Sequence, residues 1–282
     1  MTRAQARARV HSLDPSADCQ EIVALMGRYL YGWETTRALE LALFRTYGSP
    51  SISALLDRTG EFAQRGQKRY DDTALIMAEI MEHGYNSERG RAALRRMNQM
   101  HGRFTIPNED FLYVLSTFVL EPMRWSRWLS LHPWTLHERQ AAFNFWLEVG
   151  RRMNIKDIPP TLDALERWSL EYEERHFVYA DTNRRVADAT VAIFMGWFPT
   201  ALHPLLRPAV YALLDDRLRE ALGYPKQPVW LTGLLLKGAR LRAWAGEQLP
   251  VPPYEYTAQR HRSYPQGYTV EQLGADRREG PA

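Results

Sequence analysis

Apolar side chains recur along this chain at intervals of three and four residues, whereas strict alternation of apolar and polar residues never persists. The first spacing places apolar side chains on one face of an α-helix, and the second would indicate a half-buried strand. The pattern therefore predicts an all-α fold with about eleven helices. We expect them at about residues 17–31, 34–47, 51–58, 67–83, 88–101, 108–126, 136–153, 160–176, 180–198, 204–222 and 228–245.

Residues at the ends of these segments favour helix starts and stops. Hydroxyl or amide side chains stand at the beginning of three segments, at Ser51, Asn108 and Thr161, where they can cap free backbone N–H groups. Glycines follow three others, at Gly84, Gly102 and Gly223. A glycine just past a helix end often adopts the left-handed conformation, so we expect Gly102 to be left-handed and His101 to lie in the last turn.

The composition of the chain changes near both ends. Residues 1–16 contain three arginines but no apolar run, so they are expected to be a flexible N-terminus and not a secretory signal. Residues 17–245 are expected to form a single helical globular domain. Residues 246–282 are rich in Pro and Tyr, which predicts an extended tail that either packs along the domain through its tyrosines or is disordered.

The charge, the cysteine count and the length of the apolar runs exclude several classes of function. The chain has 36 Lys and Arg against 33 Asp and Glu, a net charge of +3 that is spread along the sequence, which argues against nucleic-acid binding. The single cysteine, Cys19, excludes an internal disulfide and a cysteine-based zinc site and suits the cytoplasm, where we expect the protein. No uninterrupted run reaches the ~18 apolar residues of a membrane-spanning helix. Arginines such as Arg95 and Arg96 indicate a solvated face, or contact with an anionic membrane surface.

Three side chains in the middle of the chain can form a polar site. Arg69 and Thr73 lie one helical turn apart and share a helix face. His101 lies in register with the apolar residues Leu94 and Met97 of the next predicted helix, so it is either a core histidine or a metal ligand. Together they could hold haem, with the imidazole on the iron and the cation and hydroxyl at the propionates.

The stretch from Arg37 to Trp168 resembles the MpaB/rubber-oxygenase (latex-clearing protein) family. The resemblance rests on Ala38-Leu39-Glu40-Leu41-Ala42, Gly48-Ser49-Pro50, Arg58-Thr59-Gly60-Glu61-Phe62, Arg69 with Thr73, Met100-His101-Gly102 and Pro107-Asn108-Glu109-Asp110-Phe111. It implies an all-helical domain that binds haem b between the helices that carry Arg69 and His101. It also implies that His101 is the axial iron ligand and that Arg69 and Thr73 belong to the haem pocket.

The resemblance further implies an oxygenase that uses O₂ on a small apolar substrate, isoprenoid or lipid-like. Rubber-cleaving members carry a lysine where this chain has Asp72, and a carboxylate is a poor ligand for haem iron, so we expect the distal face to be open. No residue here matches the glutamate that acts as base in rubber cleavage; Glu61 is only nearby in sequence. We expect aromatic residues to line the substrate pocket, among them Phe111, Phe118, Phe145 and Trp146.

Three alternatives compete with the haem oxygenase. A di-iron carboxylate enzyme needs two Glu-x-x-His motifs, and Glu173-Glu174-Arg175-His176 supplies one. An isoprenoid synthase needs a converging acidic cluster for Mg²⁺, for which Asp71-Asp72 and Asp215-Asp216 are the candidates. The third is a non-catalytic helical haem-binding module, which predicts an inert, six-coordinate haem.

Overall fold

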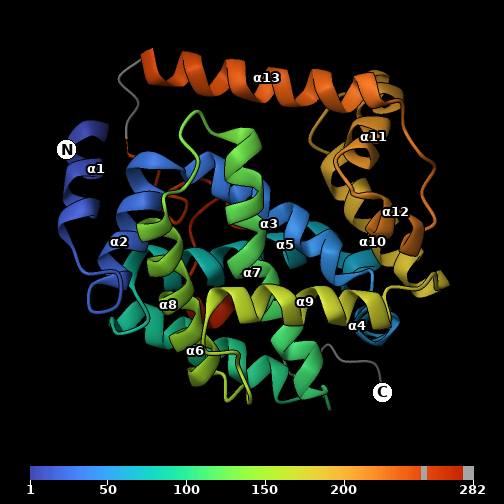
Figure 1. The fold of residues 1–282 in the computed structure, drawn as a ribbon. Helices are drawn as coiled ribbons and strands as arrows, with labels where there is room; N and C mark the ends of the chain where they lie inside the picture. Colours follow the sequence, from blue (N-terminus) through green and yellow to red (C-terminus); the bar gives the residue numbers. More distant parts are fainter. Residues whose placement is uncertain (249–252, 276–282) are drawn as a thin grey trace.

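The computed structural model describes residues 1–248 and 253–275, and within these ranges the chain forms thirteen α-helices and no β-strand (Figure 1). The all-α prediction is confirmed. The helices are α1 (Arg3–Ser12), α2 (Cys19–Leu25), α3 (Gly32–Thr46), α4 (Pro50–Thr59), α5 (Glu61–His83), α6 (Glu88–His101), α7 (Asn108–Leu129), α8 (Leu136–Arg152), α9 (Leu162–His176), α10 (Asp181–Met195), α11 (His203–Ala212), α12 (Asp216–Ala221) and α13 (Val229–Gln248). Shorter helical turns are η1 (Met26–Leu30), η2 (Thr200–Leu202) and η3 (Val270–Gln272).

Several predicted helices have different bounds in the structure. The helix expected at 17–31 consists of α2 and η1, and two further differences matter most. The helix expected at 67–83 begins earlier, at Glu61, because α5 continues across Arg65, whose backbone angles (φ −135°, ψ 38°) are not helical. The helix expected at 204–222 is divided into α11 and α12. Asp215 causes this division, since its side chain accepts a hydrogen bond from the backbone N–H of Leu218 at 3.0 Å and so starts a new helix.

The N-terminal residues are helical, so the flexible N-terminus expected over residues 1–16 is corrected. Thr2 and Gln5 cap α1 reciprocally through side chain and backbone. Ala6 and Val10 lie one turn apart on the same face and are both fully buried. That short apolar face packs against the core, an interaction that its local sequence, rich in arginine, does not reveal.

Cap predictions are partly confirmed. Thr161 caps α9, and Gly84 (φ 80°) and Gly223 (φ 68°) have positive φ. Gly102 has φ −64° and is right-handed, so the left-handed stop expected there is wrong. Its N–H still bonds to the carbonyl of Asn98 at 2.9 Å, and His101 does lie in the last turn of α6.

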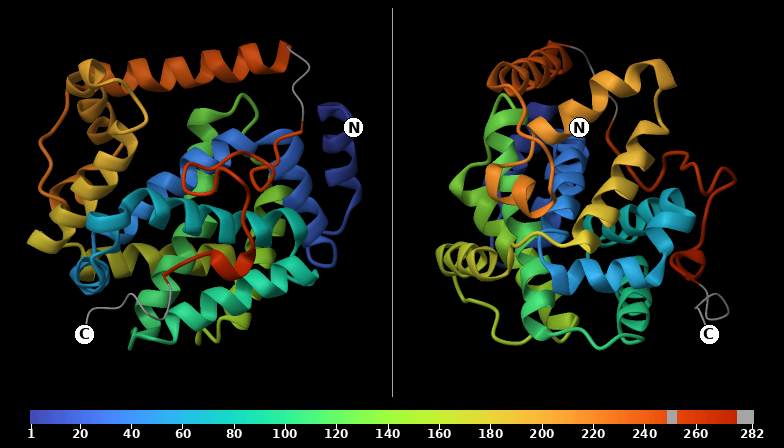
Figure 2. Two further views of the ribbon diagram at one scale, coloured as in Figure 1. Left: turned by 180° about the vertical axis from the view of Figure 1, so that it is seen from behind. Right: turned by 90° about the vertical axis from the view of Figure 1, so that its right-hand side faces the viewer.

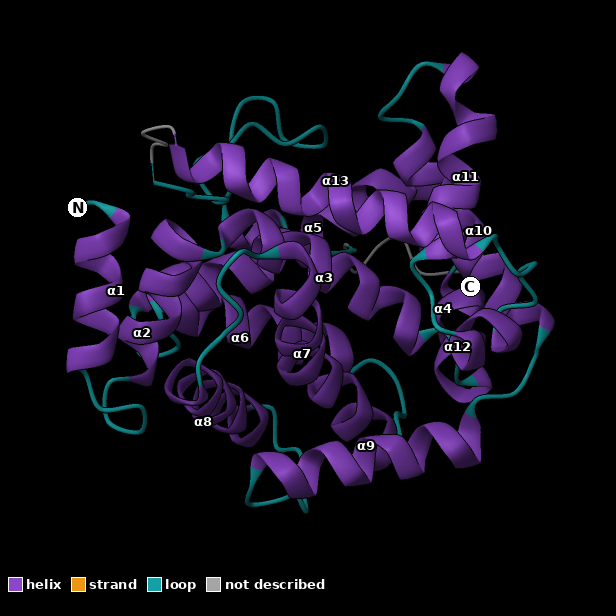
Figure 3. Cartoon of the chain, turned by 45° about the horizontal axis from the view of Figure 1, so that its top comes forward, coloured by secondary structure: helices purple, strands orange, loops and turns teal. Residues whose placement is uncertain are grey.

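Within the described residues the helices enclose two large apolar cores and a small third cluster of Ile52, Tyr113 and Tyr172. α3 and α7 cross near the centre of the molecule, and α5 and α6 form an antiparallel pair beside them (Figure 1). One buried cluster joins α2, α5, α6, α7 and α8, and a second joins the end of α3 to α10 and α12. The tilted view in Figure 3 shows α13 lying across one end of the molecule, beside α11.

The described part of the C-terminal tail packs along α5 through its tyrosines. Tyr264 donates a hydrogen bond to Asp72 with its hydroxyl, and Tyr268 donates one to Glu79 at 2.6 Å. Figure 2 shows this segment, coloured red, lying against α5 on the back of the molecule. The tail therefore supplies partners for carboxylates that α5 buries, which a carboxylate needs when it leaves water.

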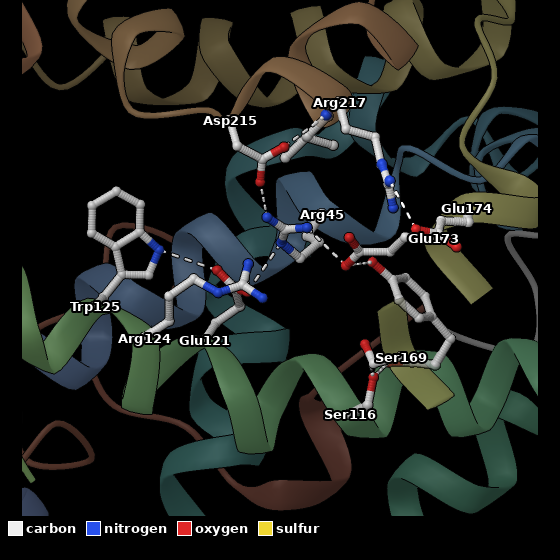
Figure 4. Close-up of polar contacts among 12 residues, drawn as sticks. Arg45, Ser116, Glu121, Arg124, Trp125, Ser169, Glu173, Glu174, Asp215 and Arg217 are labelled. Atoms are coloured by element: carbon white, nitrogen blue, oxygen red, sulfur yellow. Dashed lines mark hydrogen bonds and ion pairs between the residues drawn. The ribbon is translucent and has the colours of Figure 1, made fainter. Parts of the chain in front are cut away.

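Arg45 binds three carboxylates from three other helices (Figure 4). Its guanidinium lies 3.0 Å from Glu121 of α7 and 2.7 Å from Glu173 of α9, and it also pairs with Asp215 before α12. Tyr113 of α7 donates a hydrogen bond to Glu173 at 3.1 Å. The Arg45 cluster, defined as Arg45, Glu121, Glu173, Asp215 and Tyr113, thus ties α3 to α7, α9 and α12.

We predict that Arg45→Met destabilises the protein by about 3–5 kcal/mol, because it leaves Glu121 and Glu173 buried without their cation. The midpoint of urea unfolding measures this loss. Arg217→Met is the matched control, since Arg217 pairs with Glu174 at 3.2 Å on the surface, where a pair contributes about 1 kcal/mol or less. Equal urea midpoints for the two variants would show that the Arg45 cluster is not a structural centre.

Candidate functional site

Arg69 and Thr73 lie side by side on α5, as the sequence predicts. The Arg69 guanidinium donates a hydrogen bond to the Thr73 hydroxyl, and that hydroxyl donates to the Arg69 carbonyl at 2.9 Å. The guanidinium also lies 5.4 Å from the ring centre of Phe62. Within the described residues no carboxylate pairs with Arg69. A half-buried cation with only a hydroxyl and a ring as neighbours suits an anionic ligand.

His101 extends from the end of α6 toward this pair. Its ring meets the edge of Phe111, with 5.3 Å between the ring centres. Its Nδ1 atom is buried and has no hydrogen-bond partner among the described residues. Burial, and secondly the charge of Arg69, lower the pKa of His101 to about 4. The imidazole is therefore neutral at physiological pH, the form that ligates metals.

Asp72 is turned toward the tail. It is buried, lies 2.9 Å from Lys68 Nζ and accepts a hydrogen bond from the Tyr264 hydroxyl. Glu61, the other acid considered from the sequence, pairs with Arg65 at 2.6 Å in the first turn of α5. Neither carboxylate belongs to the group formed by Arg69, Thr73 and His101.

An apolar cavity lies between α3 and α5, on the side of α5 away from α6. Its empty volume is about 760 Å³ including the open mouth. Apolar side chains of α5 and α3 such as Met77 and Leu39 form the walls, and Thr73 borders it. Arg69 and His101 do not line it. This cavity is therefore separate from the haem position expected between α5 and α6, which stays a prediction.

The aromatic residues expected in the pocket are distributed unequally. Phe118 lines this cavity and also an adjoining one of about 340 Å³, and Trp146 lines the second. Phe145 is fully buried in the core, and Phe111 contacts His101. The tail adds Tyr254 and Tyr256 to the wall of the first cavity, which pattern analysis along the helices did not indicate.

Glu40 is a candidate functional residue that sequence reasoning did not select. Its side chain is only 10% exposed, lies in the wall of the larger cavity, pairs with Arg37 at 2.7 Å and accepts a hydrogen bond from the Tyr70 hydroxyl. Burial raises the pKa of Glu40 to about 7, although Arg37 and Tyr70 act in the opposite direction. In the sequence, Glu40 is the single acidic residue within the apolar run 38–42, and this feature could have indicated a buried carboxyl. A carboxyl with a pKa near 7 in a cavity is suited to proton transfer.

The side chains considered for the di-iron and Mg²⁺ alternatives form ion pairs, ring contacts or helix caps with other residues. Glu173 pairs with Arg45, and His176 stacks on Tyr172 with 4.3 Å between ring centres. Asp215 caps α12 and pairs with Arg45. In the part of the chain that the structure describes, no three His, Cys, Asp or Glu side chains converge as a metal-ligand set. The structure therefore offers no support for a di-iron site or an acidic Mg²⁺ cluster there.

The comparison with protein families decides the classification. The family described as ER-bound oxygenase mpaB/B'/Rubber oxygenase, catalytic domain, matches residues 27–246. This chain belongs to that family. It is 33% identical over 206 residues to ER-bound oxygenase mpaB of Penicillium roqueforti. The matched segment covers 67% of this chain and 69% of the relative. It is 32% identical over 210 residues to ER-bound oxygenase mpaB' of Penicillium brevicompactum, covering 68% of this chain and 50% of the relative.

Membership in the MpaB/rubber-oxygenase family confirms the resemblance found in the sequence and gives the coarse function, an oxygenase of this family. The cytoplasmic location expected from the sequence is contradicted, because the family and these relatives are named ER-bound. A single cysteine and the lack of a long apolar run are too general to establish a compartment. None of the described helices is long and apolar enough to traverse a bilayer.

We predict that Glu40 makes the protein less stable as the pH rises from about 5 to 8. The native carboxyl keeps its proton up to a pKa of about 7, whereas the unfolded chain releases it near 4.5. Stability present at low pH is therefore lost as the pH passes through the native pKa, by up to about 3 kcal/mol.

Urea unfolding at pH 5 and pH 8 tests this, with Glu40→Gln as the variant that cannot titrate. Its stability should change less between the two pH values than that of the wild type. Glu174→Gln is the control, since Glu174 is 63% exposed on α9 and pairs with Arg217 at 3.2 Å, far from the cavity lining. An identical pH dependence for wild type and Glu40→Gln would contradict the raised pKa.

Proposed function

We propose that this chain is a haem b-dependent oxygenase that oxidises a small apolar substrate with O₂. The observation that carries the proposal is the buried ring nitrogen of His101 without a partner among the described residues, on a ring that feels the charge of Arg69. Burying such groups is costly unless a partner satisfies them. An iron porphyrin with propionates would satisfy both, because it supplies a metal for the imidazole and an anion for the guanidinium.

The residues present fit this group. His101 would ligate the iron as a neutral imidazole, and Arg69 with Thr73 would hold a propionate. Thr73 connects the two parts of the site, since it contacts Arg69 and also borders the cavity. When bound, the haem would supply the redox-active iron at which O₂ reacts. Asp72 is held by Lys68 and Tyr264, which supports an iron face without a ligand from that position.

The side chains around the cavity supply the remaining functions. Leu39, Leu43 and Met77 give it apolar walls, which would bind an isoprenoid or lipid-like molecule and exclude water. Glu40 is the group that we propose to hold or accept a proton, at Oε2, because Oε1 already faces the Tyr70 hydroxyl and the Arg37 guanidinium. Its pKa of about 7 allows both protonation states near neutral pH.

We predict that the purified protein, expressed with ample haem and iron, has a Soret band and that His101→Ala loses it. The imidazole is the ligand whose loss frees the iron. His176→Ala is the matched control, because His176 lies in the last turn of α9 as His101 does in the last turn of α6, and no residue of the proposed haem site is on α9. A colourless, metal-free wild type would contradict the haem assignment.

The visible spectrum of the same preparation separates an oxygenase from the non-catalytic haem-binding module. An open distal face predicts a high-spin or water-ligated ferric haem that binds cyanide or imidazole, and a ferrous form that binds CO. A low-spin, six-coordinate spectrum that resists added ligands would favour the inert module.

We predict that Arg69→Ala lowers haem occupancy while leaving the helix content unchanged, because the guanidinium is a partner of the propionate and not part of the apolar core. The haem-to-protein ratio and far-UV circular dichroism measure the two effects. Arg69→Lys should retain part of the occupancy, since it keeps the charge but loses the planar fork. Arg58→Ala, at an exposed position on α4, should match the wild type. Equal occupancy in Arg69→Ala would remove Arg69 from the haem site.

A further inference from the structure

Helix α13 presents a stripe of large apolar side chains to solvent. Trp230 is 67% exposed, Leu234 59%, Leu241 64% and Trp244 54%. Their spacing along the helix places all four on one face. We call these four residues the α13 face. Single exposed apolar residues are ordinary, but an apolar patch of this extent marks an interaction surface.

The opposite side of α13 is fixed to the rest of the protein. The Arg242 guanidinium lies 3.7 Å from the ring centre of Trp33 and 2.9 Å from the carboxylate of Glu34, both on α3. Thr232 donates a hydrogen bond to the carbonyl of Ala212 at the end of α11 at 2.8 Å. These contacts near both ends hold the helix in one rotation, so the α13 face is directed outward by the fold itself.

The α13 face lies at one end of the molecule together with the start of α11. Figure 2 shows α13 and α11 at the same end in both views. Leu202 and Leu205, which precede and open that part of α11, are 43% and 64% exposed.

The charges beside the α13 face favour an anionic lipid surface as that partner. Lys237 and Arg240 are exposed on the same helix, and Arg240 also donates a hydrogen bond to the Arg127 carbonyl at 3.3 Å. Residues 229–246 contain no acidic side chain. Tryptophan and basic residues combine at the interface of membranes with anionic headgroups, where the indoles sit between tails and water.

We propose that the α13 face docks the protein on the surface of a membrane that contains anionic lipids. Trp230, Leu234, Leu241 and Trp244 enter the boundary between headgroups and tails. Lys237 and Arg240 contact the headgroups. This inference concerns a surface outside the haem and cavity residues, so it stands or fails independently of the proposed function.

Cosedimentation of the full chain with vesicles tests the proposal. We use vesicles of phosphatidylcholine alone and of phosphatidylcholine mixed with phosphatidylserine. The double variant Leu234→Glu, Leu241→Glu should bind the mixed vesicles about tenfold more weakly or less still, because it places two charges among the tails. Leu136→Glu is the matched control, since Leu136 is 80% exposed at the start of α8, and it should bind like the wild type.

A second experiment tests the contribution of Lys237 and Arg240 to vesicle binding. Lys237→Glu, Arg240→Glu should weaken binding to the mixed vesicles, and added salt should weaken wild-type binding in the same way. Circular dichroism and urea unfolding establish that each variant folds, and Leu241→Gln replaces the double variant if that one does not.

Three results would overturn the proposal. One is a wild type that binds neither vesicle. Another is a folded Leu234→Glu, Leu241→Glu variant that binds as well as the wild type or no worse than Leu136→Glu. The third is a wild-type dimer in light scattering that this variant converts to a monomer while the wild type ignores vesicles, which would assign the α13 face to a second copy of the chain.

Discussion

The buried pairing of Arg45 with Glu121, Glu173 and Asp215 is the constraint on which the arrangement of helices depends. A guanidinium that leaves water must have its charge compensated, and here the three carboxylates come from three separate regions of the chain. The position of α3 relative to α7, α9 and α12 is thereby restricted. Since α3 and α7 carry Leu39 and Phe118, which line the cavity, the same pairing determines where two cavity walls stand.

α5 contributes both to the cavity and to the packing of the tail, because two of its faces have different neighbours. One face carries Tyr70, Thr73 and Met77 along the cavity. Another buries Asp72 and Glu79, whose carboxylates receive hydrogen bonds from tyrosines of the tail. Residues 253–275 of the tail are therefore part of the folded structure, because removing them would leave buried carboxylates without some of their donors.

Opposite pKa shifts distinguish the two titratable groups near the proposed reaction. Burial and the neighbouring Arg69 favour neutral His101, with a pKa of about 4, and burial favours the protonated form of Glu40, with a pKa of about 7. A neutral imidazole is ready to ligate iron without losing a proton, and a carboxyl near pH 7 can exchange one. Two groups that desolvation shifts in opposite directions can thus serve an oxygenase in an apolar site without additional charges.

The sequence by itself determined the all-α class, most helix positions, the family, and the adjacency of Arg69 and Thr73, because helical periodicity and a spacing of four residues act locally. It did not reveal the buried face of α1 or the division of the helix at 204–222, since both depend on partners distant in sequence. Only the tertiary structure placed the cavity between α3 and α5, turned Asp72 toward Tyr264 and raised the pKa of Glu40. Burial and charge pairing arise from the meeting of distant segments, and a one-dimensional pattern does not specify which segments meet.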